Sequence, residues 1–415
     1  MALELFNRDN ELRGYSLIRA TELKKQIEPY LDKTKDLLTG FNLTEFYSIQ
    51  KERILTHFNA TQADWEDWRW QMRHRITDVN TLNSIFPLTE EHQLEIAEVG
   101  RTYRWAVSPY YLSLMNFNTL NDPIILQGIP KAEELLDSSG EDDPMGEAFT
   151  SPAPCITRRY PDRLIINVTN ICGMYCRHCQ RRRNIGETDA HKNRDNLVQA
   201  LDYVRANPEI RDVLITGGDA LLLSDGTLDW LLGELHSIPH VEIKRIGTRV
   251  PVTLPMRITD NLMFILAKYP PIYINTQFNH AKEVTLEAKI AADKLVSAGV
   301  ILGNQAVLLK GINNNPHIMK KLNQELLKIR IRPYYIFHAK NVKGTRHFIP
   351  SIQEGIAIME ALRGFTSGLA VPTYIINAPK GGGKTPILPQ YLLSLDEHEA
   401  VLRTWEGKIV HYENH

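Results

Sequence analysis

The sequence predicts an α/β protein in which a helical N-terminal region is followed by strands and helices that alternate around a parallel sheet. From about residue 15 to residue 130, apolar residues recur at intervals of three and four, the period of an amphipathic helix. One such stripe contains Trp65, Trp68 and Met72, and we interpret it as core packing. Further along the chain, short β-rich runs alternate with stretches of helical length, a pattern typical of β/α units around a parallel sheet. These runs are 164–169, 212–216, 241–246, 272–277, 301–309, 331–337 and 372–376.

A break in this pattern suggests where the domains meet. The stretch 137–154 is rich in acidic residues, Pro and small residues, and it interrupts all periodicity. We interpret it as a linker between a helical region at 1–136 and a second domain at 155–390. The last residues, 391–415, form a short C-terminal extension without a motif of its own. A chain of 415 residues is long enough for this division.

Composition argues against several classes of partner. Charged residues make up 23% of the chain and the formal net charge is −1, so nothing favours binding to nucleic acid or to an anionic membrane surface. The N-terminus lacks the basic and then apolar pattern of a signal segment, and no apolar run approaches the roughly 20 residues of a membrane span. We therefore expect a soluble, cytoplasmic protein with a small-molecule partner.

Three of the four cysteines stand close together, directly after the run 164–169. They are Cys172, Cys176 and Cys179. Each iron of a [4Fe–4S] cluster takes one cysteine and four are normally needed, so three thiolates leave one iron open for another ligand. The alternatives are chance clustering and a structural zinc site, although zinc usually takes four ligands and no second cysteine pair exists here. Thiolate ligation of iron requires a reducing compartment, and Cys155 is left over as an ordinary thiol.

The cysteine spacing, with His178 before the last cysteine, resembles that of the radical S-adenosylmethionine (SAM) enzymes. In that family the open iron binds the amino and carboxylate groups of SAM. The resemblance implies an open, partial (β/α)6 radical SAM barrel, with the helical N-terminal region and the short C-terminal extension added to it. Gly217, Gly218 and Asp219 end the second predicted strand and look like the family's motif for the SAM amino group. Two glycines let a ligand approach the backbone closely and leave its polar groups free. His178 and Gln305 are further SAM contacts by resemblance.

Lys384 follows three glycines near the C-terminus. The letters Gly-Lys-Thr suggest a phosphate-binding P-loop, but that motif needs a glycine where Ala378 stands, so we exclude it. A glycine run also gives a lysine amine room to form a Schiff base with pyridoxal 5′-phosphate (PLP). Arg159 and Arg163 are candidates for the PLP phosphate, because arginine offers bidentate hydrogen bonds to phosphate oxygens. A solvated lysine on a flexible loop, and ordinary solvated arginines, remain alternative interpretations.

Together, the cysteines, the Arg-Tyr-Pro-Asp-Arg sequence at 159–163 and the Gly-Gly-Gly-Lys-Thr-Pro sequence at 381–386 resemble the 2,3-aminomutases. The likeness runs from about Trp65 to the C-terminus. It implies an isomerase that combines a [4Fe–4S] cluster, SAM and PLP to move an amino group from the α- to the β-carbon, with Lys384 as its catalytic PLP lysine. It also implies an electron donor such as flavodoxin or ferredoxin, and a homo-oligomer, either a dimer or a tetramer.

The same resemblance predicts the residues that bind the substrate. Arg181 matches the arginine that binds the α-carboxylate. Lysine-acting members hold the distant ammonium of lysine with two aspartates, and the matching residues here are Lys340 and Asn377. This reversal of charge predicts a side-chain carboxylate on the substrate, and hence the interconversion of L-glutamate and β-glutamate. Aspartate remains conceivable from the sequence alone.

Two other functions stay open. One is a 2,3-aminomutase for lysine, either free or protein-linked, against which the charge reversal argues. The other is an iron–sulfur protein that uses its cluster only for electron transfer. Lysine-acting members also bind zinc through cysteines near their C-terminus, and because this chain has no cysteine after Cys179 we expect no zinc.

Overall fold

The computed structural model describes residues 2–119, 121–137 and 139–414. The chain forms two compact units, Met1–Leu38 and Thr39–His415. The first unit contains the helix α1 (Ala2–Thr34), which begins well before residue 15, where the helical pattern was expected to start. The predicted boundaries at 137–154 and at 390 both lie within the second unit, so this division does not test them and they remain predictions. None of the helices in the described residues is long and apolar enough to cross a membrane.

The predicted helical region is confirmed in the first part of the second unit. Short helices follow one another up to residue 136 and enclose apolar side chains that join the main core. They are α2 (Thr44–Phe58), α3 (Gln62–Glu66), α4 (Trp68–Arg73), α5 (Val79–Ile85), α6 (Glu90–Thr102), α7 (Pro109–Ser113), α8 (Ile125–Gly128) and α9 (Glu133–Leu136).

The aromatic stripe near residue 68 lies on two helices rather than on one face of a single helix. Asp67 is extended, and its carboxylate accepts hydrogen bonds from the backbone N–H groups of Arg69 and Trp70, at 2.9 and 3.2 Å. This cap begins α4, because it satisfies N–H groups that have no partner in the first turn of a helix. The expected core packing is nevertheless present: Trp65 is buried, and Trp68 and Met72 pack against the core.

The seven predicted β-runs form the parallel part of a nine-stranded sheet, which confirms the open, partial barrel. The strand order is β1 to β9 in sequence, and neighbours from β2 to β8 are parallel. The antiparallel strands β1 (Ile156–Thr157) and β9 (Gly383–Pro386) flank the two edges and leave the sheet open. The parallel strands are β2 (Arg163–Thr169), β3 (Asp212–Gly217), β4 (Ile243–Gly247), β5 (Ile272–Thr276), β6 (Ile301–Leu308), β7 (Arg332–His338) and β8 (Thr373–Ala378).

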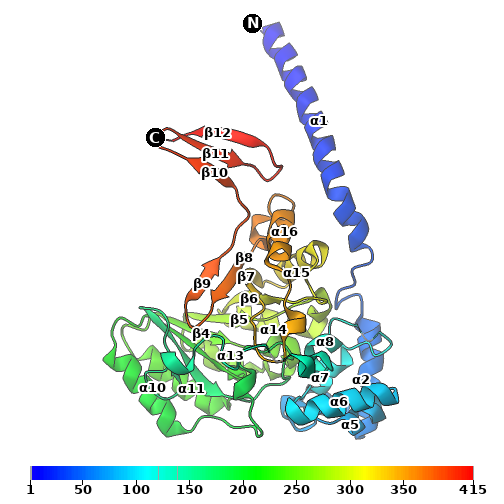
Figure 1. Ribbon diagram of the computed structural model, residues 1–415, viewed down its shortest axis with the longest axis vertical. Coiled ribbons are helices and arrows are strands. Elements are labelled where there is room, and N and C mark those ends of the chain that lie inside the picture. The colour runs from blue at the N-terminus through cyan, green and yellow to red at the C-terminus, as the bar shows by residue number, and fades with distance from the viewer. Residues whose placement is uncertain (1, 120, 138, 415) are drawn as a thin grey trace. The chain divides into compact units, whose positions relative to one another are not determined.

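Helices connect each parallel strand to the next. Each of the six longest connecting helices begins at a Ser, Thr or Asn side chain that accepts a hydrogen bond from its first turn. Figure 1 shows α10 and α11 beside the early strands and α15 and α16 beside the late ones. The six are α10 (Arg194–Ala206), α11 (Asp225–His236), α13 (Asp260–Ala267), α14 (Leu286–Ser297), α15 (Pro316–Lys328) and α16 (Ile352–Leu362), and the short α12 (Val250–Thr253) follows β4.

Short 3-10 helices complete the connections. Within the described chain they are η1 (Ala148–Thr150), η2 (Arg182–Asn184), η3 (Ala220–Leu222), η4 (Pro255–Arg257), η5 (Ala281–Glu283), η6 (Arg346–Phe348) and η7 (Gly368–Ala370). The stretch predicted to be a linker contains η1 and is bound to the barrel by its backbone. The N–H of Lys380 donates to the carbonyl oxygen of Pro144 at 3.1 Å, and the N–H of Lys343 donates to that of Glu141 at 3.1 Å. The stretch therefore packs against the segments that follow β7 and β8.

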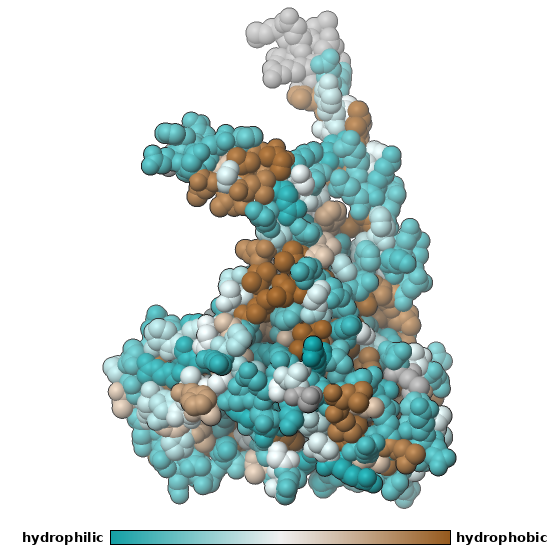
Figure 2. All heavy atoms as spheres, in the orientation of Figure 1, coloured by the Kyte–Doolittle hydropathy of each residue, from teal (hydrophilic) through white to brown (hydrophobic). Residues whose placement is uncertain are grey.

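The C-terminal extension is more regular than the sequence suggested. It forms a three-stranded antiparallel sheet of β10 (Leu392–Leu395), β11 (Glu399–Arg403) and β12 (Ile409–Glu413). Figure 2 shows apolar side chains gathered on this sheet. The large ones with more than a third of their area exposed are Leu392, Leu393, Leu395, Ile409, Val410 and Tyr412.

The packing of α16 on β8 leaves no room for a side chain at Gly355. A Cβ atom there would overlap the phenol ring of Tyr374, which is fully buried. We expect Gly355→Ala to lower the free energy of unfolding by about 1 to 3 kcal/mol through overpacking, measured as a fall in the midpoint of thermal unfolding. Gly226→Ala is the matched control, since Gly226 is an exposed helical glycine with open space around it. Equal midpoints for the two variants would contradict this packing.

Candidate active site

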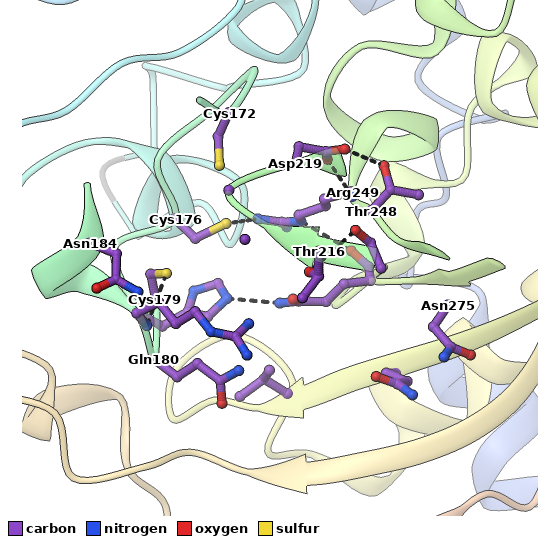
Figure 3. Close-up of a pocket in the computed structure, with 18 of the residues that line it drawn as sticks. Cys172, Cys176, Cys179, Gln180, Asn184, Thr216, Asp219, Thr248, Arg249 and Asn275 are labelled. Carbon is purple, nitrogen blue, oxygen red and sulfur yellow. Dashed lines mark hydrogen bonds between the residues drawn. The ribbon is translucent and has the colours of Figure 1, made fainter. Parts of the chain in front are cut away.

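One cavity of about 290 Å³ gathers nearly all of the predicted site residues. It lies where the parallel strands end, the usual place for ligands in sheets of this kind. Arg163 is the one predicted residue outside its lining. The predicted residues that line it are Arg159, Cys172, Cys176, His178, Cys179, Arg181, Gly217, Gly218, Asp219, Gln305, Lys340, Asn377 and Lys384. Figure 3 shows part of this lining.

The three cysteines come from the segment between β2 and η2. The Sγ atom of Cys176 accepts a hydrogen bond from Nη1 of Arg249 at 2.8 Å, as Figure 3 shows, and Sγ of Cys179 accepts one from the backbone N–H of Arg181 at 3.4 Å. Among the described residues, no three His, Cys, Asp or Glu side chains are arranged to hold a single metal ion. A [4Fe–4S] cluster does not need such convergence, because each cysteine binds a different iron. The cysteines therefore fit a cluster better than a lone ion.

Buried ion pairs hold this cysteine segment against the helical region. The guanidinium of Arg177 donates from Nε and Nη2 to the carboxylate of Glu134, at 2.9 and 2.6 Å, and Arg182 pairs with the same carboxylate. Glu134 has no exposed area, and the two guanidiniums hold its pKa below the usual range, although burial alone would raise it. Arg75 adds a hydrogen bond to the carbonyl oxygen of Cys172 at 2.8 Å. Together these bonds orient the segment toward the cavity.

The glycines at the end of β3 line the cavity and also pack against the chain's own backbone. The N–H groups of Gly218 and Asp219 are not free for a ligand, because they donate to the carbonyl oxygens of Thr169 and Ile171, at 2.5 and 2.7 Å. A Cβ atom on either glycine would overlap this backbone, and Gly217 has a φ of +133°. The glycines are thus needed for β3 to pack against the start of the cysteine segment. The carboxylate of Asp219 accepts hydrogen bonds from Thr248 and from the N–H of Arg249.

His178 and Gln305 both line the cavity, as expected. Nε2 of His178 accepts a hydrogen bond from the side-chain amide of Gln277 at 3.0 Å, and Nδ1 has no partner among the described residues. Burial and the nearby Arg249 lower the pKa of His178 well below its usual value, so the ring is neutral. A neutral ring with one free N–H matches a contact to an uncharged heterocycle. Gln305 reaches the cavity from β6.

Lys384 lies on strand β9, not on a free loop. It pairs with Asn377 of β8, and its backbone N–H donates to the hydroxyl of Tyr160 at 2.9 Å. Its Nζ atom lies 4.8 Å from the ring centroid of Tyr335 and 5.4 Å from that of Phe337. The amine therefore lies close to two aromatic rings, a surrounding suited to a planar cofactor.

Three arginines lie near enough to Lys384 to affect its pKa. Burial, followed by Arg245, Arg163 and Arg159, lowers the pKa of Lys384 to about 8. Arg163 stacks on the ring of Tyr160, with 4.0 Å from its guanidinium carbon to the ring centroid. A cluster of this kind fits a phosphate group, for which arginine is well shaped. Sequence reasoning did not assign Arg245, although its place two residues before Gly247 on β4 puts both on one face of the strand.

Arg181 is held by a carboxylate that sequence reasoning missed. Glu147 accepts hydrogen bonds from Nε of Arg181 at 3.0 and 3.1 Å and from Nη2 at 2.8 Å. It also accepts one from Arg159 at 3.4 Å. Nothing in the acidic stretch marks Glu147, because its partners lie elsewhere in the sequence.

Lys340 and Asn377 both reach the cavity and both lack acceptors. No salt bridge in the described chain involves Lys340, and the Nδ2 atom of Asn377 is buried without a hydrogen-bond partner. Burial, followed by Arg181, Arg159 and Lys384, lowers the pKa of Lys340 to about 7. The two side chains therefore offer unused donors to one space.

Comparison with known proteins identifies the family. The chain is 56% identical over 405 residues to the glutamate 2,3-aminomutase of Clostridioides difficile (strain 630), covering 98% of this chain and 96% of that protein. It is 48% identical to the L-lysine 2,3-aminomutase of Clostridium subterminale, over 85% of each chain. The chain belongs to the radical SAM 2,3-aminomutase family. The radical SAM superfamily matches residues 166–316, and the family described as lysine-2,3-aminomutase matches residues 359–415.

Membership determines the cofactors and the reaction class. Radical SAM enzymes use a [4Fe–4S] cluster and SAM, and the 2,3-aminomutases also use PLP. The chain is accordingly an isomerase, and its substrate is a small molecule, an amino acid. The L-lysine 2,3-aminomutase of Bacillus subtilis (strain 168) is 46% identical over 85% of this chain and 75% of its own. Overall identity to both kinds of relative is high, so the choice of amino acid depends on individual side chains.

The aminomutase depends on Glu134 to keep two arginines of the cysteine segment paired. Glu134→Ala leaves the guanidiniums of Arg177 and Arg182 buried without a counter-charge, with 2% and 8% of their side-chain areas exposed. We expect a loss of about 3 to 5 kcal/mol in the free energy of unfolding, measured by thermal unfolding. Glu209→Ala is the control, because Glu209 is half exposed in its pair with Arg158 and exposed ion pairs contribute little to stability. A Glu134→Ala effect no larger than the control would refute the role of the buried pair.

Proposed function

We propose that this aminomutase interconverts L-glutamate and β-glutamate by moving the amino group between C2 and C3. The observation that carries the proposal is the pair of unused donors, Lys340 and Asn377, in one cavity. A side-chain carboxylate accepts hydrogen bonds from both an ammonium and an amide, whereas a side-chain ammonium accepts none. The glutamate 2,3-aminomutase of Clostridioides difficile, at 56% identity, supports the same substrate.

Charge argues against lysine as the substrate. Below pH 7, where Lys340 is cationic, an ammonium group placed opposite it is an uncompensated buried charge, which costs about 3 to 5 kcal/mol. This corresponds to about two to three and a half decades in affinity. Aspartate has the same charge as glutamate but one methylene less, so its carboxylates span a shorter distance than those of glutamate. Glutamate is therefore the substrate that we propose.

We propose the remaining contacts from the sequence motifs, and all of these residues except Arg163 line the cavity. Cys172, Cys176 and Cys179 hold the cluster. The residues that contact SAM are His178, Gly217, Gly218, Asp219 and Gln305. When bound, the cluster with SAM supplies hydrogen-atom abstraction from carbon, and PLP supplies a carbonyl carbon that carries the migrating nitrogen.

The side chains of this protein orient the reactants. Arg159 and Arg163 bind the PLP phosphate, Arg181 binds the α-carboxylate of glutamate, and Lys340 with Asn377 binds the γ-carboxylate. The two carboxylates of the substrate are then bound at its two ends, and C2 and C3 are held between them. Such orientation is the main contribution that a protein makes to a reaction of this kind. A site recessed in a cavity also keeps water away from reactive species.

Lys384 is the catalytic lysine in this proposal. It holds PLP, and its amine takes up and releases protons as the substrate amine replaces it. A pKa of about 8 leaves part of the amine neutral near neutral pH, and only a neutral amine attacks a carbonyl carbon. Tyr335 and Phe337, whose rings lie near the Lys384 amine, would offer aromatic surface to a planar cofactor held there.

We also infer an electron donor such as flavodoxin or ferredoxin, since the cluster needs one electron to cleave SAM. The exposed apolar side chains of β10 and β12 support a homo-oligomer, dimer or tetramer, because contiguous apolar surface of this kind marks protein interfaces. A cytoplasmic location and the absence of zinc remain predictions from the sequence.

The direct test of the proposed function is product formation. The reconstituted enzyme is incubated without oxygen with dithionite, SAM, PLP and 13C-labelled L-glutamate, and the products are identified by NMR. We expect β-glutamate to accumulate until it reaches equilibrium with L-glutamate. Absence of β-glutamate from a preparation that contains the cluster and PLP and turns over L-lysine would refute the proposal.

A lysine 2,3-aminomutase is the second candidate, favoured by relatives at 46 to 48% identity. Exchange of the two donors for carboxylates distinguishes it. We expect the double variant Lys340→Asp with Asn377→Asp to lose glutamate turnover by a factor of about 100 or more, because two carboxylates then face the γ-carboxylate. Steady-state kinetics on both amino acids measures the change. Unaltered glutamate turnover in this variant would remove Lys340 and Asn377 from the site.

The pKa of Lys340 predicts how glutamate binding depends on pH. Because this pKa is lowered to about 7 in the free protein, Lys340 is cationic below pH 7 and loses its charge as the pH rises above it. We therefore expect the KM for glutamate to rise as the pH increases above about 7, by up to tenfold for each pH unit. In Lys340→Arg the guanidinium stays charged, so the KM should change little over the same range. The same rise of KM in both proteins would assign the titration to another group.

A further inference from the structure

Glu147 lies at the centre of a group of arginines beside the cavity. It precedes η1 in the stretch between α9 and β1, and only 6% of its area is exposed. Its carboxylate pairs with Arg181 at 2.8 Å, with Arg159 at 3.4 Å and with Arg183 at 3.5 Å. These arginines hold the pKa of Glu147 below its usual value, although burial alone would raise it. The carboxylate is therefore an anion shared by several cations.

Glu147 binds the Nε and Nη2 atoms of the Arg181 guanidinium and leaves the Nη1 atom without a contact to Glu147. The Nε and Nη2 atoms of Arg181 donate to the two carboxylate oxygens, which is the bidentate arrangement that orients a guanidinium most strongly. No hydrogen bond of the Nη1 atom is found within the described residues. Arg181 lines the cavity, whereas Glu147 does not. The carboxylate thus binds the guanidinium from behind, and Nη1 remains available on the cavity side.

The turn that carries Glu147 is anchored to the segment that leads to Lys384. The carbonyl oxygen of Pro144 accepts from the N–H of Lys380 at 3.1 Å. Asp143 closes the turn, because its carbonyl oxygen accepts from the N–H of Gly146 and its carboxylate from the N–H of Ala148, both at 3.0 Å. The position of Glu147 is therefore coupled to the backbone that precedes Lys384.

We propose that Glu147 is a positioning residue, which sets the guanidinium of Arg181 relative to Arg159 and so places the substrate's α-carboxylate relative to the cofactor phosphate. The inference rests on the proposed function, in which these two arginines bind those two groups. Without the shared anion, Arg159, Arg181 and Arg183 repel one another and Arg181 loses its bidentate partner. The substrate still meets a cationic pocket, but its reacting carbons are held less closely.

We expect the loss of the Glu147 carboxylate to change kcat but not the affinity of the enzyme for glutamate. A misplacement of about 1 Å costs up to a hundredfold in rate, so we expect Glu147→Gln to lower kcat by about tenfold to a hundredfold. The dissociation constant for glutamate should stay within about threefold of the wild-type value, since the cations that attract carboxylates remain. This constant is measured on the reconstituted holoenzyme without reductant, from the change in PLP absorbance when glutamate is added, and so does not depend on turnover.

Asp143→Asn is the matched control. Asp143 lies in the same turn and pairs with Arg183 of the same arginine run at 3.1 Å, but neither of these two residues lines the cavity. The amide oxygen of asparagine still closes the turn, so kcat should stay within about threefold of the wild-type value. If kcat fell equally in Glu147→Gln and Asp143→Asn, the loss of any negative charge in the turn would lower kcat. That result would overturn the proposal. A rise of kcat/KM in Glu147→Gln would also overturn it, because Glu147 would then compete with the substrate for Arg181.

A second variant covers the case in which Glu147→Gln does not fold. Glu147→Asp keeps the charge but withdraws the carboxylate by one methylene, and we expect an intermediate fall of kcat with unchanged glutamate affinity. Wild-type kcat in a folded Glu147→Asp would overturn the proposal. Failure of the proposed function is a separate result, because it is seen in the wild-type enzyme as an absence of glutamate turnover. The comparison of variants with wild type can be made with whichever amino acid the wild-type enzyme converts.

Discussion

The balance of charge around one cavity is the constraint on which the rest of the site depends. Several arginines surround the ends of the parallel strands, and buried cations are costly unless they are paired. Four of these arginines form ion pairs with carboxylates: Arg177 with Glu134, Arg181 with Glu147, Arg245 with Asp212 and Arg249 with Glu283. Lys340 and Lys384 have no such partner in the described part of the chain. The cavity therefore keeps unpaired cations that favour anionic ligands, and this is what a phosphorylated cofactor and a dicarboxylic amino acid share.

The fold supplies the places from which these charges converge. Parallel strands end at the same edge of the sheet, so segments that are distant in sequence open into one cavity. The cysteine segment follows β2, the glycines end β3, and Lys384 reaches the same space from the antiparallel strand β9. Buried networks then orient each segment. Arg249, for example, donates to Cys176 and pairs with Glu283, whose second oxygen accepts from the N–H of Asn279. The cysteines are thus positioned by side chains from several elements.

Patterns that repeat locally were predictable from the sequence, and contacts between distant residues were not. The seven parallel strands could be predicted because apolar β-runs alternate with helical stretches, and Lys384 because glycines precede it. Glu147 could not be predicted, since its partners are 12 to 36 residues away and acidic residues in a Pro-rich stretch usually face solvent. The glycines at 217 and 218 show a related difficulty: the sequence indicates that something approaches the backbone closely, but it does not say that this is the chain itself. The stripe of Trp65, Trp68 and Met72 was expected on one helix but lies on two. The carboxylate of Asp67 caps the second helix, and such a side chain competes with continuation of the first.

The account depends most on Lys340 and Asn377 facing the far end of the substrate, and a competition experiment tests this most directly. The reconstituted wild-type enzyme receives L-glutamate and L-lysine at equal concentrations, and the consumption of each is followed in the same vessel. The ratio of the two rates gives the ratio of kcat/KM values without separate measurements of either constant. At a pH below 7, where Lys340 is cationic, we expect glutamate to be preferred by a factor of about 100 or more, the ratio that corresponds to an unpaired buried charge. Consumption of lysine at an equal or higher rate would contradict it.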